Sequence, residues 1–510
     1  MEATIEAGRE RFTQLLRAEL TKFRTVRAWM IALCAAAAAA VILSFLSAFA
    51  SRATMPAVPI GPGGEAVSDT YMYVHQALAG DGALTVRVAS LSGTHTSDSG
   101  NSGSAFGVSS RGGQAGPQHP GMVPWAKAGI ILEPDTRPGT DYAAVMLTGA
   151  HGVQLQYDYT RSRPGLAGSA GPASPRWLRL TRAGDIITGY DSADGATWHK
   201  IGRVRLAGLP RAVQVGLFVS SPAYFAPGAT QGSPSTATAT FDQLSVRGDL
   251  PRGAWTGQPV AGFYPSGLGA STWQRPAPGM FRISGSGDIA PLVGGTHWSG
   301  ASIVNGTIAG LLVVIVLAAL FVTTEYRRRL IRVTLSAWPR RGQVLAAKAV
   351  IAGSLAFIAG VVATGIAEAI TRHVFAANGN YLFPQGGLAT ARVIIGTGLF
   401  LGLGAALVVA LGTMLRRGAW TVLAGLALLV LPGVLATSLP AGADRWLMKV
   451  TPTAAFAIQA TLPRSGLVTD AYIPASGYFP ISSWAGLAVL AAYTAVALGA
   501  AAWVLRRRDA

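Results

Sequence analysis

Six runs of about twenty apolar residues constrain this 510-residue chain more than any other feature. A transmembrane helix needs roughly 20 such residues, because it must cross a hydrocarbon layer about 30 Å thick. The runs occupy residues 29–50, 303–323, 344–367, 393–415, 420–439 and 484–505. Only 13% of the residues are charged and the mean hydropathy is +0.39, whereas roughly a quarter are charged in soluble domains. The sequence therefore predicts a membrane protein with six spans.

Positive charges are distributed unevenly among the segments between these runs. The segments 1–28, 324–343, 416–419 and 506–510 together contain 17 Lys and Arg residues, whereas the loops 368–392 and 440–483 contain five. Because Lys and Arg in short loops favour the cytoplasmic side, we predict that both termini are cytoplasmic and that residues 51–300 are extracytoplasmic. The net charge of +18 then lies largely on loop ends, so it does not indicate a nucleic-acid partner.

The chain offers little for metal, redox or nucleotide chemistry. Cys34 is the single cysteine, so no disulfide or cysteine metal site can form within the chain. The histidines of the region 51–300 show no ligand spacing, and no G-x-x-x-x-G-K-[ST] motif occurs. We predict no catalytic residue, no metal and no cofactor.

The segment 325–339 combines many arginines with an apolar face. On a helix, that face consists of Leu330, Ile331, Thr334, Leu335 and Trp338. Arg328, Arg329 and Arg332 lie largely opposite, and Pro339 ends the helix. Such a helix in a short cytoplasmic loop is either a membrane-surface anchor or a docking element for a partner. We favour docking, because topology alone requires a few arginines but no pattern.

The segment 1–28 is also amphipathic. Its apolar face consists of Phe12, Leu15, Leu16, Leu20 and Phe23. Glu19 falls on that face, where an unpaired carboxylate is costly. Lys22 is the nearest partner along the chain; in the alternative, Glu19 reaches the lipid headgroups. We predict a helix along the inner membrane surface that presents Glu19, Lys22 and Arg24 at an interface.

The region 51–300 has the signature of β structure rather than helix. LTVRVASL alternates apolar and polar residues, and WLRLTRAGDIITGYDSADGATWHKIGRVRL consists of candidate strands joined by turns. The predicted parts are a linker at 51–65, an antiparallel sandwich over 67–247 with a long loop at 92–121, and a juxtamembrane stalk over 252–300. Trp198 is expected in the sandwich core, and Asp288 is expected to accept hydrogen bonds from turn amides.

Several of these strands resemble a known module. GDGALTVRVASL, AGIILEP, WLRLTRAGDIITGYDSADGATWHKIG and ATFDQLSV resemble, in this order, the concanavalin-like, laminin-G-like jelly-roll modules of bacterial surface proteins. The resemblance implies a jelly roll and, by analogy of fold alone, a glycan or another surface ligand. A near match to the sialidase Asp-box at 192–198 lacks one residue, and we interpret it as a hairpin. Glycosidase chemistry is not indicated, because the carboxylates lie mostly beside turns.

Two membrane-flanking segments, LLRAELTKFRTVRAWM and TTEYRRRLIRVTLSAWPRRGQVLAAKA, resemble the permease subunits of type-2 ABC exporters. The residues that match the loop pattern of that family are Glu325, Tyr326, Arg327, Ile331, Arg332, Thr334, Leu335, Pro339, Arg341 and Lys348. The resemblance implies that 325–339 is a coupling helix that presses into a separate ABC ATPase. The coupling residues it implies are Glu325, Tyr326, Arg327, Ile331, Arg332, Leu335, Trp338 and Arg341. It also implies a homodimer, or a heterodimer with a related permease, in the lipid bilayer of a bacterial inner membrane.

These patterns together predict an all-α six-span permease bundle with an all-β jelly-roll sandwich inserted between spans one and two. The predicted parts are the N-terminal helix 1–28, span one at 29–50, the extracytoplasmic region 51–300 and the remaining spans in 301–510. The expected function is that of a permease subunit of an ATP-driven exporter whose sandwich binds a ligand. The alternative is a non-transporting receptor or scaffold that senses an extracellular ligand through the sandwich, and a membrane-tethered hydrolase is a third candidate.

Overall fold

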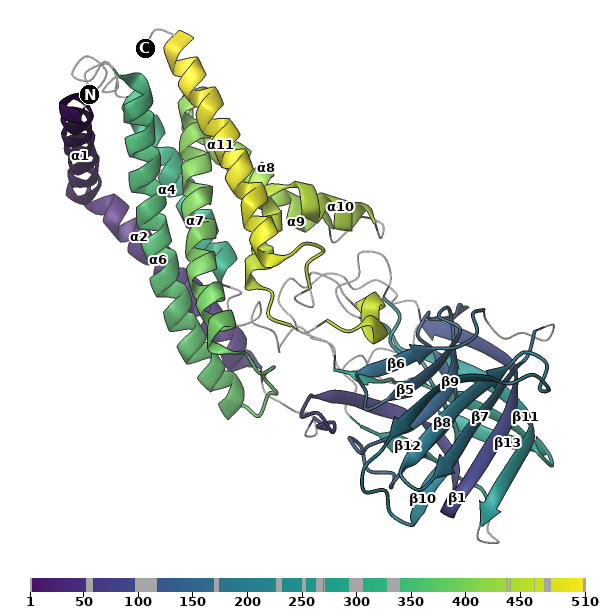
Figure 1. Cartoon of the computed structure of the whole chain (residues 1–510). Coiled ribbons are helices and arrows are strands. Elements are labelled where there is room, and N and C mark those ends of the chain that lie inside the picture. Colours follow the sequence, from purple (N-terminus) through teal and green to yellow (C-terminus); the bar gives the residue numbers. More distant parts are fainter. Residues whose placement is uncertain are drawn as a thin grey trace. The chain divides into compact units, whose positions relative to one another are not determined.

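A computed structural model describes most of the chain. The described residues are 2–51, 58–96, 117–168, 174–225, 232–249, 254–262, 269, 271–292, 306–327, 340–436, 439, 442–462, 464–471 and 478–507. The chain divides into two compact units. The first comprises Met1–Thr54, Gly294–Pro463 and Tyr472–Ala510, and the second comprises Met55–Val293 and Arg464–Ala471. The first unit is helical and the second is built mainly from strands (Figure 1).

The helices of the first unit account for most of the predicted apolar runs. They are α1 (Glu2–Thr25), α2 (Arg27–Ala50), α4 (Thr307–Arg327), α6 (Arg341–Ala377), α7 (Gly387–Leu415), α8 (Gly418–Leu429), α9 (Leu431–Ala436), α10 (Ala443–Val450), η1 (Pro452–Gln459) and α11 (Ser483–Arg507). Among the described residues, five helices are long and apolar enough to cross a membrane: α2, α4, α6, α7 and α11. These helices are those of a membrane protein.

The fifth predicted span, 420–439, is not one continuous helix. Its residues form α8, of 12 residues, and α9, of six, which meet at Val430. Pro432 explains the break, because proline has no amide hydrogen and its ring would clash with the Leu428 carbonyl group in a continuous helix. Within the first turn of α9 the same proline is tolerated.

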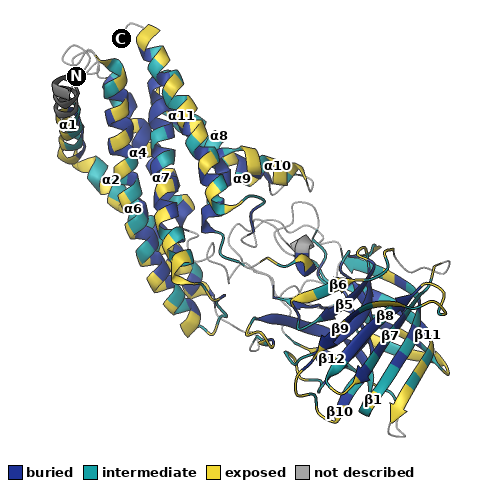
Figure 2. Cartoon of the chain, viewed as in Figure 1, coloured by how far each residue is buried: buried dark blue, intermediate teal, exposed yellow. Residues whose placement is uncertain are grey.

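Helices α6 and α7 pack closely against each other. A Cβ atom on Gly402 would lie 2.8 Å from the carbonyl oxygen of Gly353, and one on Gly398 would lie 2.9 Å from that of Phe357. Small residues let helix backbones approach each other in a membrane, where burial of apolar surface does not drive association. The large apolar side chains that α6 exposes are Val350, Ile358, Val362, Ile366 and Ile370. Figure 2 shows exposed positions along the length of α6. The spacing of these side chains puts them on one side of α6, as in a helix that faces lipid.

The second unit is an antiparallel β structure that folds into two layers. Its elements are β1 (Val67–Thr96), β2 (Gln118–Pro120), β3 (Lys127–Glu133), β4 (Ala143–Thr148), β5 (Val153–Tyr157), β6 (Arg161–Pro164), β7 (Arg176–Ala183), β8 (Ile186–Ser192), β9 (His199–Arg205), β10 (Ala212–Ser220), β11 (Ser235–Asp249), β12 (Thr256–Ala261), β13 (Thr272–Ala277), β14 (Met280–Gly285), β15 (Ile289–Pro291) and η2 (Gly466–Ala471). One layer has the order β12–β1–β10–β3–β4–β5–β6, and the other has the order β13–β14–β11–β1–β7–β8–β9.

Strand β1 belongs to both layers. Its first half, up to Ala79, pairs with β10 and β12, and its second half, from Gly82, pairs with β11 and β7. The register shifts between the halves, where Gly80 has φ = 71°, a conformation that glycine adopts at little cost. Side chains from both layers, such as Leu217 and Leu180, fill the core between them.

The β unit extends beyond the predicted 67–247, and the predicted stalk over 252–300 is wrong for its described residues. Strands β12, β13 and β14 join the two layers, and β15 pairs with the start of β1. In β14, alternation buries Phe281 and Ile283 in the core. Asp288 accepts a hydrogen bond from the Ile289 amide at 2.8 Å and, unexpectedly, one from the buried ammonium group of Lys127. Sequence reasoning missed these strands because each is at most six residues long and lies among glycines and prolines.

The predicted hairpin between β8 and β9 is confirmed, but Trp198 does not lie in the core. The Trp198 ring is partly exposed, and the guanidinium carbon of Arg179 lies 3.7 Å from its centroid. In the turn, Asp194 accepts hydrogen bonds from the Thr197 and Ala196 amides, each at 2.8 Å. These amides lower the pKa of Asp194. The carboxylate is therefore bound within the turn, as the hairpin interpretation requires.

Candidate functional site

The N-terminal helix α1 packs through its predicted apolar face. At the start of α6, the residues that pack together are Phe12, Leu15 and Leu16 of α1 with Val344 and Ala347 of α6. Near the end of α1, the ring of Phe23 lies 5.6 Å from that of Trp29 and 5.7 Å from that of Phe321 in α4. The amphipathic pattern is therefore confirmed, and it holds α1 against both α4 and α6.

Glu19 lies on this face and is only 3% exposed. Both of its carboxylate oxygens accept hydrogen bonds from Nζ of Lys348 in α6, at 3.0 and 2.9 Å. The prediction that Lys22 pairs with Glu19 is wrong, and so is the alternative in which Glu19 reaches the headgroups. Lys22 bonds instead to Glu325 of α4. A tertiary partner replaces the local one because a buried carboxylate must be paired, whereas an i,i+3 pair on a helix surface contributes little.

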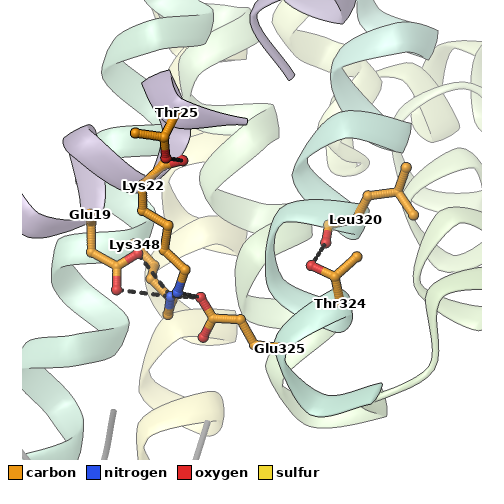
Figure 3. Close-up of polar contacts among 7 residues, drawn as sticks. All are labelled: Glu19, Lys22, Thr25, Leu320, Thr324, Glu325 and Lys348. Atoms are coloured by element: carbon orange, nitrogen blue, oxygen red, sulfur yellow. Dashed lines mark hydrogen bonds and ion pairs between the residues drawn. The ribbon is translucent and has the colours of Figure 1, made fainter. Parts of the chain in front are cut away.

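Lys348 joins three helices at one point (Figure 3). Its ammonium group donates to Oε1 of Glu325 at 2.6 Å as well as to Glu19. The same Oε1 atom accepts a hydrogen bond from Lys22. We call Glu19, Lys22, Glu325 and Lys348 the charge cluster. With two carboxylates and two ammonium groups, the cluster is balanced in charge and connects α1, α4 and α6.

Burial makes the members of the charge cluster depend on one another. Glu325 and Lys348 are 2% and 3% exposed, and an unpaired ion in such surroundings costs several kcal/mol. Lys22, with 31% of its side chain exposed, can be solvated and depends least on its partner. Nζ of Lys348 also lies 5.2 Å from the centroid of the Phe321 ring, where a cation is attracted by the aromatic face. The cluster is therefore continuous with the aromatic contact between α1 and α4.

A small cavity of about 10 Å³ borders the charge cluster, enough for about one water molecule. Its lining includes Glu325, Lys348, Tyr326 and Arg341. No described residue donates a hydrogen bond to Oε2 of Glu325, although that atom is buried. Arg341 donates to the carbonyl oxygen of Leu505 in α11 at 2.8 Å. Glu325 thus keeps one free acceptor close to the end of α4.

The structure brings together only some of the residues predicted for coupling. Glu325 is buried in the charge cluster, and Tyr326 is half-buried with the guanidinium carbon of Arg416 5.3 Å from its ring centroid. Arg327 and Arg24 are exposed. Four of the predicted coupling residues lie outside the described residues: Ile331, Arg332, Leu335 and Trp338.

Sequence reasoning gave Lys348 no role of its own. The signal was a cation inside the apolar run 344–367, where an unpaired charge is costly. Glu19, on an apolar helix face, and Glu325, at the end of another apolar run, are negative charges that are costly for the same reason. Charges that are each costly where they stand, and opposite in sign, are candidates for pairing with one another.

A second group of buried ionisable side chains lies in the β unit. The Tyr71 hydroxyl donates to Glu133 and the Tyr159 hydroxyl to Asp69, each at 2.7 Å. Burial raises the pKa of Glu133 well above its usual value. Burial also raises the pKa of Asp69 to about 6, although bonds from Gly139 and Tyr159 act in the opposite direction. Both carboxyl groups belong to residues only 2–3% exposed, so a substrate cannot reach them and we interpret them as structural.

Comparisons with known proteins assign the chain to no family. No protein-family model and no curated protein matches it. The chain is similar to a functionally unknown protein from Saccharomyces cerevisiae, with a TM-score of 0.23 and 13% identity over 39% of this chain and 84% of that one. It is also similar to Scytalido-glutamic peptidase bound to a peptide-based transition state analog, with a TM-score of 0.24 and 10% identity over 43% of this chain and 98% of that one. TM-scores this low carry no argument about fold or activity.

Proposed function

We propose that the chain is the transmembrane permease subunit of an ATP-driven exporter of the type-2 ABC class. A separate ATPase drives it, and two permease subunits, identical or related, form the membrane part. The β unit, a jelly-roll module in this proposal, lies outside the cytoplasmic membrane and binds a ligand there. The observation that carries the proposal is the buried charge cluster, because it links the helices on either side of the predicted docking segment to the N-terminal helix.

The position of the charge cluster in the chain suits a mechanical role. Helix α4 ends at Arg327 and α6 begins at Arg341, so the predicted coupling segment connects them. Glu325 and Lys348 lie close to these two ends and are bonded to each other. A partner that pushes on the connecting segment would therefore move both helices together, and Glu19 would carry the motion to α1. Separating the cluster is unfavourable, because it leaves buried charges unpaired.

The runner-up function is that of a receptor or scaffold without transport. It is supported by the size of the β unit, which has its own core and comprises Met55–Val293 and Arg464–Ala471. The two functions differ in one requirement, since transport needs an ATPase partner and reception of a ligand does not. Both place the β unit on the outer side.

The test is recovery of an ATPase with the tagged full-length chain from membranes of its native host. We expect a protein that carries G-x-x-x-x-G-K-[ST] to co-purify in a mild detergent. The double variant Ile331→Ala, Leu335→Ala should reduce its recovery at least tenfold, because large-to-small changes in a packed interface typically cost ~2–5 kcal/mol. Arg328→Ala, on the opposite face of the same segment, is the matched control and should have little effect.

Two outcomes would contradict the proposal. Full recovery of the ATPase with the double variant, at equal membrane abundance, would mean that the segment is only a topological anchor. Absence of any P-loop protein with the unmodified chain would favour the receptor.

A further inference from the structure

The outer face of the second β layer carries two adjacent rows of cross-strand neighbours. Strand register places one row as Ser245, Thr85, Arg179, Tyr190 and Lys200, from β11 across β1, β7 and β8 to β9. The next row is Arg247, Ala83, Thr181, Thr188 and Arg203. Residues paired across antiparallel strands share a face, and the residues between the rows, such as Leu84 and Leu180, point into the core. We call these ten residues the basic face; Figure 1 shows β9, β8, β7 and β11 together.

The cations of the basic face lack anionic partners among the described residues. Neither row contains a carboxylate. Asp242, in the adjoining row, is already held by two hydrogen bonds from Arg87, at 2.7 and 2.6 Å. Lys200, Arg203 and Arg247 are exposed and take part in none of the ion pairs found among the described residues.

Arg179, at the centre of the basic face, shows the effect of this crowding. Its Nε donates to the Thr85 hydroxyl at 3.0 Å, and its guanidinium group lies over the Trp198 ring. Partial burial, followed by the charge of Arg247, lowers its pKa. Repulsion between neighbouring cations is relieved when an anion binds between them. The basic face therefore has the electrostatics of an anion-binding surface.

The spacing of the cations favours a polymer over a small anion. Neighbouring strands lie about 4.8 Å apart, so Arg247 and Arg203, at the two ends of a five-strand row, are roughly 19 Å apart. A single phosphate or carboxylate reaches one of them, whereas a chain with repeated charges can reach both. Ala83, Thr181 and Thr188 have short side chains between them, so an extended chain can lie across the strands.

The groups between the cations decide which polyanion fits. They include the hydroxyl groups of Thr181, Tyr190 and Ser245, and that of Thr85, which accepts a hydrogen bond from Arg179; Thr188 is buried. Hydroxyls both donate and accept hydrogen bonds, so they match the hydroxyls of a sugar better than the bare acceptors of a phosphate chain. We propose that the basic face binds an acidic polysaccharide that lies across the strands of the second layer. This names the ligand of the β unit; its source outside the cell rests on the function proposed above, but the binding itself does not.

The test uses the purified full-length chain in a non-ionic detergent and fluorescein-labelled polygalacturonate, with fluorescence anisotropy as the readout. We expect saturable binding that weakens as salt is raised, because paired charges release counterions, and no binding of labelled neutral dextran. The variant Arg203→Glu, Arg247→Glu should weaken polygalacturonate binding at least tenfold. Arg137→Glu, Arg211→Glu makes the same change in net charge at exposed positions off the face and should change binding less than twofold.

Three results would overturn the inference. The first is that polygalacturonate does not bind, and the second is that the control variant loses as much affinity for it as the Arg203→Glu, Arg247→Glu variant. The third is that polyphosphate binds as tightly as polygalacturonate, which would indicate a surface for bare polyanions. Arg203→Ala, Arg247→Ala, which removes the charges without reversing them, should still weaken binding if the Glu variant fails to fold. Co-purification of the ATPase with the same variants keeps the two proposals apart, since changes on the basic face should leave it intact.

Discussion

Replacing Lys348 with methionine is the most direct perturbation of the charge cluster. Methionine retains an unbranched apolar side chain but removes three hydrogen bonds, two to Glu19 and one to Glu325. Glu325 keeps its bond from Lys22, whereas no second cation bonds Glu19 among the described residues. Glu19, 3% exposed, is then a buried carboxylate without a partner. Breaking a buried ion pair from one side costs ~3–5 kcal/mol, and we expect a loss of stability in that range.

Removing the charge of Glu19 as well should restore part of this loss. In Glu19→Gln, Lys348→Met no unpaired carboxylate remains at Glu19, so the double variant should be more stable than the sum of the two single variants predicts. For residues in one ion-pair network, the coupling is typically ~0.5–3 kcal/mol. This non-additivity distinguishes a specific pair from general damage to packing.

Thermal unfolding of the full-length chain in detergent measures these effects. About 1 kcal/mol shifts Tm by ~2–4 °C in a domain of 150–250 residues, so Lys348→Met should lower Tm by roughly 6–20 °C. Lys22→Met is the matched control in the same cluster, because the Lys22 side chain is 31% exposed and Glu325 keeps its hydrogen bond from Lys348. Solvent screens the pair that is lost and no buried carboxylate is left without a partner, so we expect a loss below ~1 kcal/mol. A wild-type Tm for Lys348→Met, or strict additivity in the cycle, would refute the reasoning.

Three further predictions address other parts of the molecule. Asp69 has a pKa of about 6 in the folded state against an ordinary value of 3.8, so the folded protein binds this proton more tightly and the stability that it contributes is lost as pH rises from about 4 to 6. Asp69→Asn should remove on the order of 3 kcal/mol of that pH dependence. The measurement is the change in Tm between pH 4 and pH 7, and a pH profile equal to that of the wild type would contradict the prediction. In a Cys34→Ala background, a cysteine at Ser174 should react with a membrane-impermeant maleimide in intact spheroplasts and one at Ser336 should not, whereas labelling at Ser336 from outside would overturn the topology. Phe23→Ala should cost ~3–5 kcal/mol, because Phe23 is 2% exposed and packs on two aromatic rings; a Tm within 2 °C of wild type would show that α1 is not held by this contact.

The helical unit was predictable where one physical effect decides the outcome. Hydropathy over about twenty residues located α2, α4, α6, α7 and α11, because each must be apolar along its whole length. It gave no sign of the break within 420–439, where Pro432 interrupts the helix without lowering the hydropathy. It also said nothing about which helices touch. The partner of Glu19 is 329 residues away in sequence, and pairing over that separation follows from the packing of three helices rather than from local spacing.

The β unit was predictable in kind and less so in extent. Alternation located the strands from β7 to β11, where several long strands follow one another. The strands β12 to β15 are three to six residues long, and a period of two cannot be recognised with confidence in so few residues among prolines and glycines. Trp198 was misplaced for a different reason. A large aromatic residue is usually buried, but a neighbouring arginine can cover it on an outer face, and only register reveals that Arg179 faces outward.

Helix α4 is held near both of its ends. Its first residue, Thr307, follows the β unit along the chain, and Glu325 lies near its last residue. At 21 residues, α4 is about 30 Å long, and its start is held to α2 where the Gly306 amide donates to the Ser44 hydroxyl at 3.1 Å. A rigid helix fixed to a neighbour at one end and to a balanced charge cluster at the other can shift only if both contacts adjust. A partner that docks at the connecting segment must therefore overcome both contacts before α4 can move.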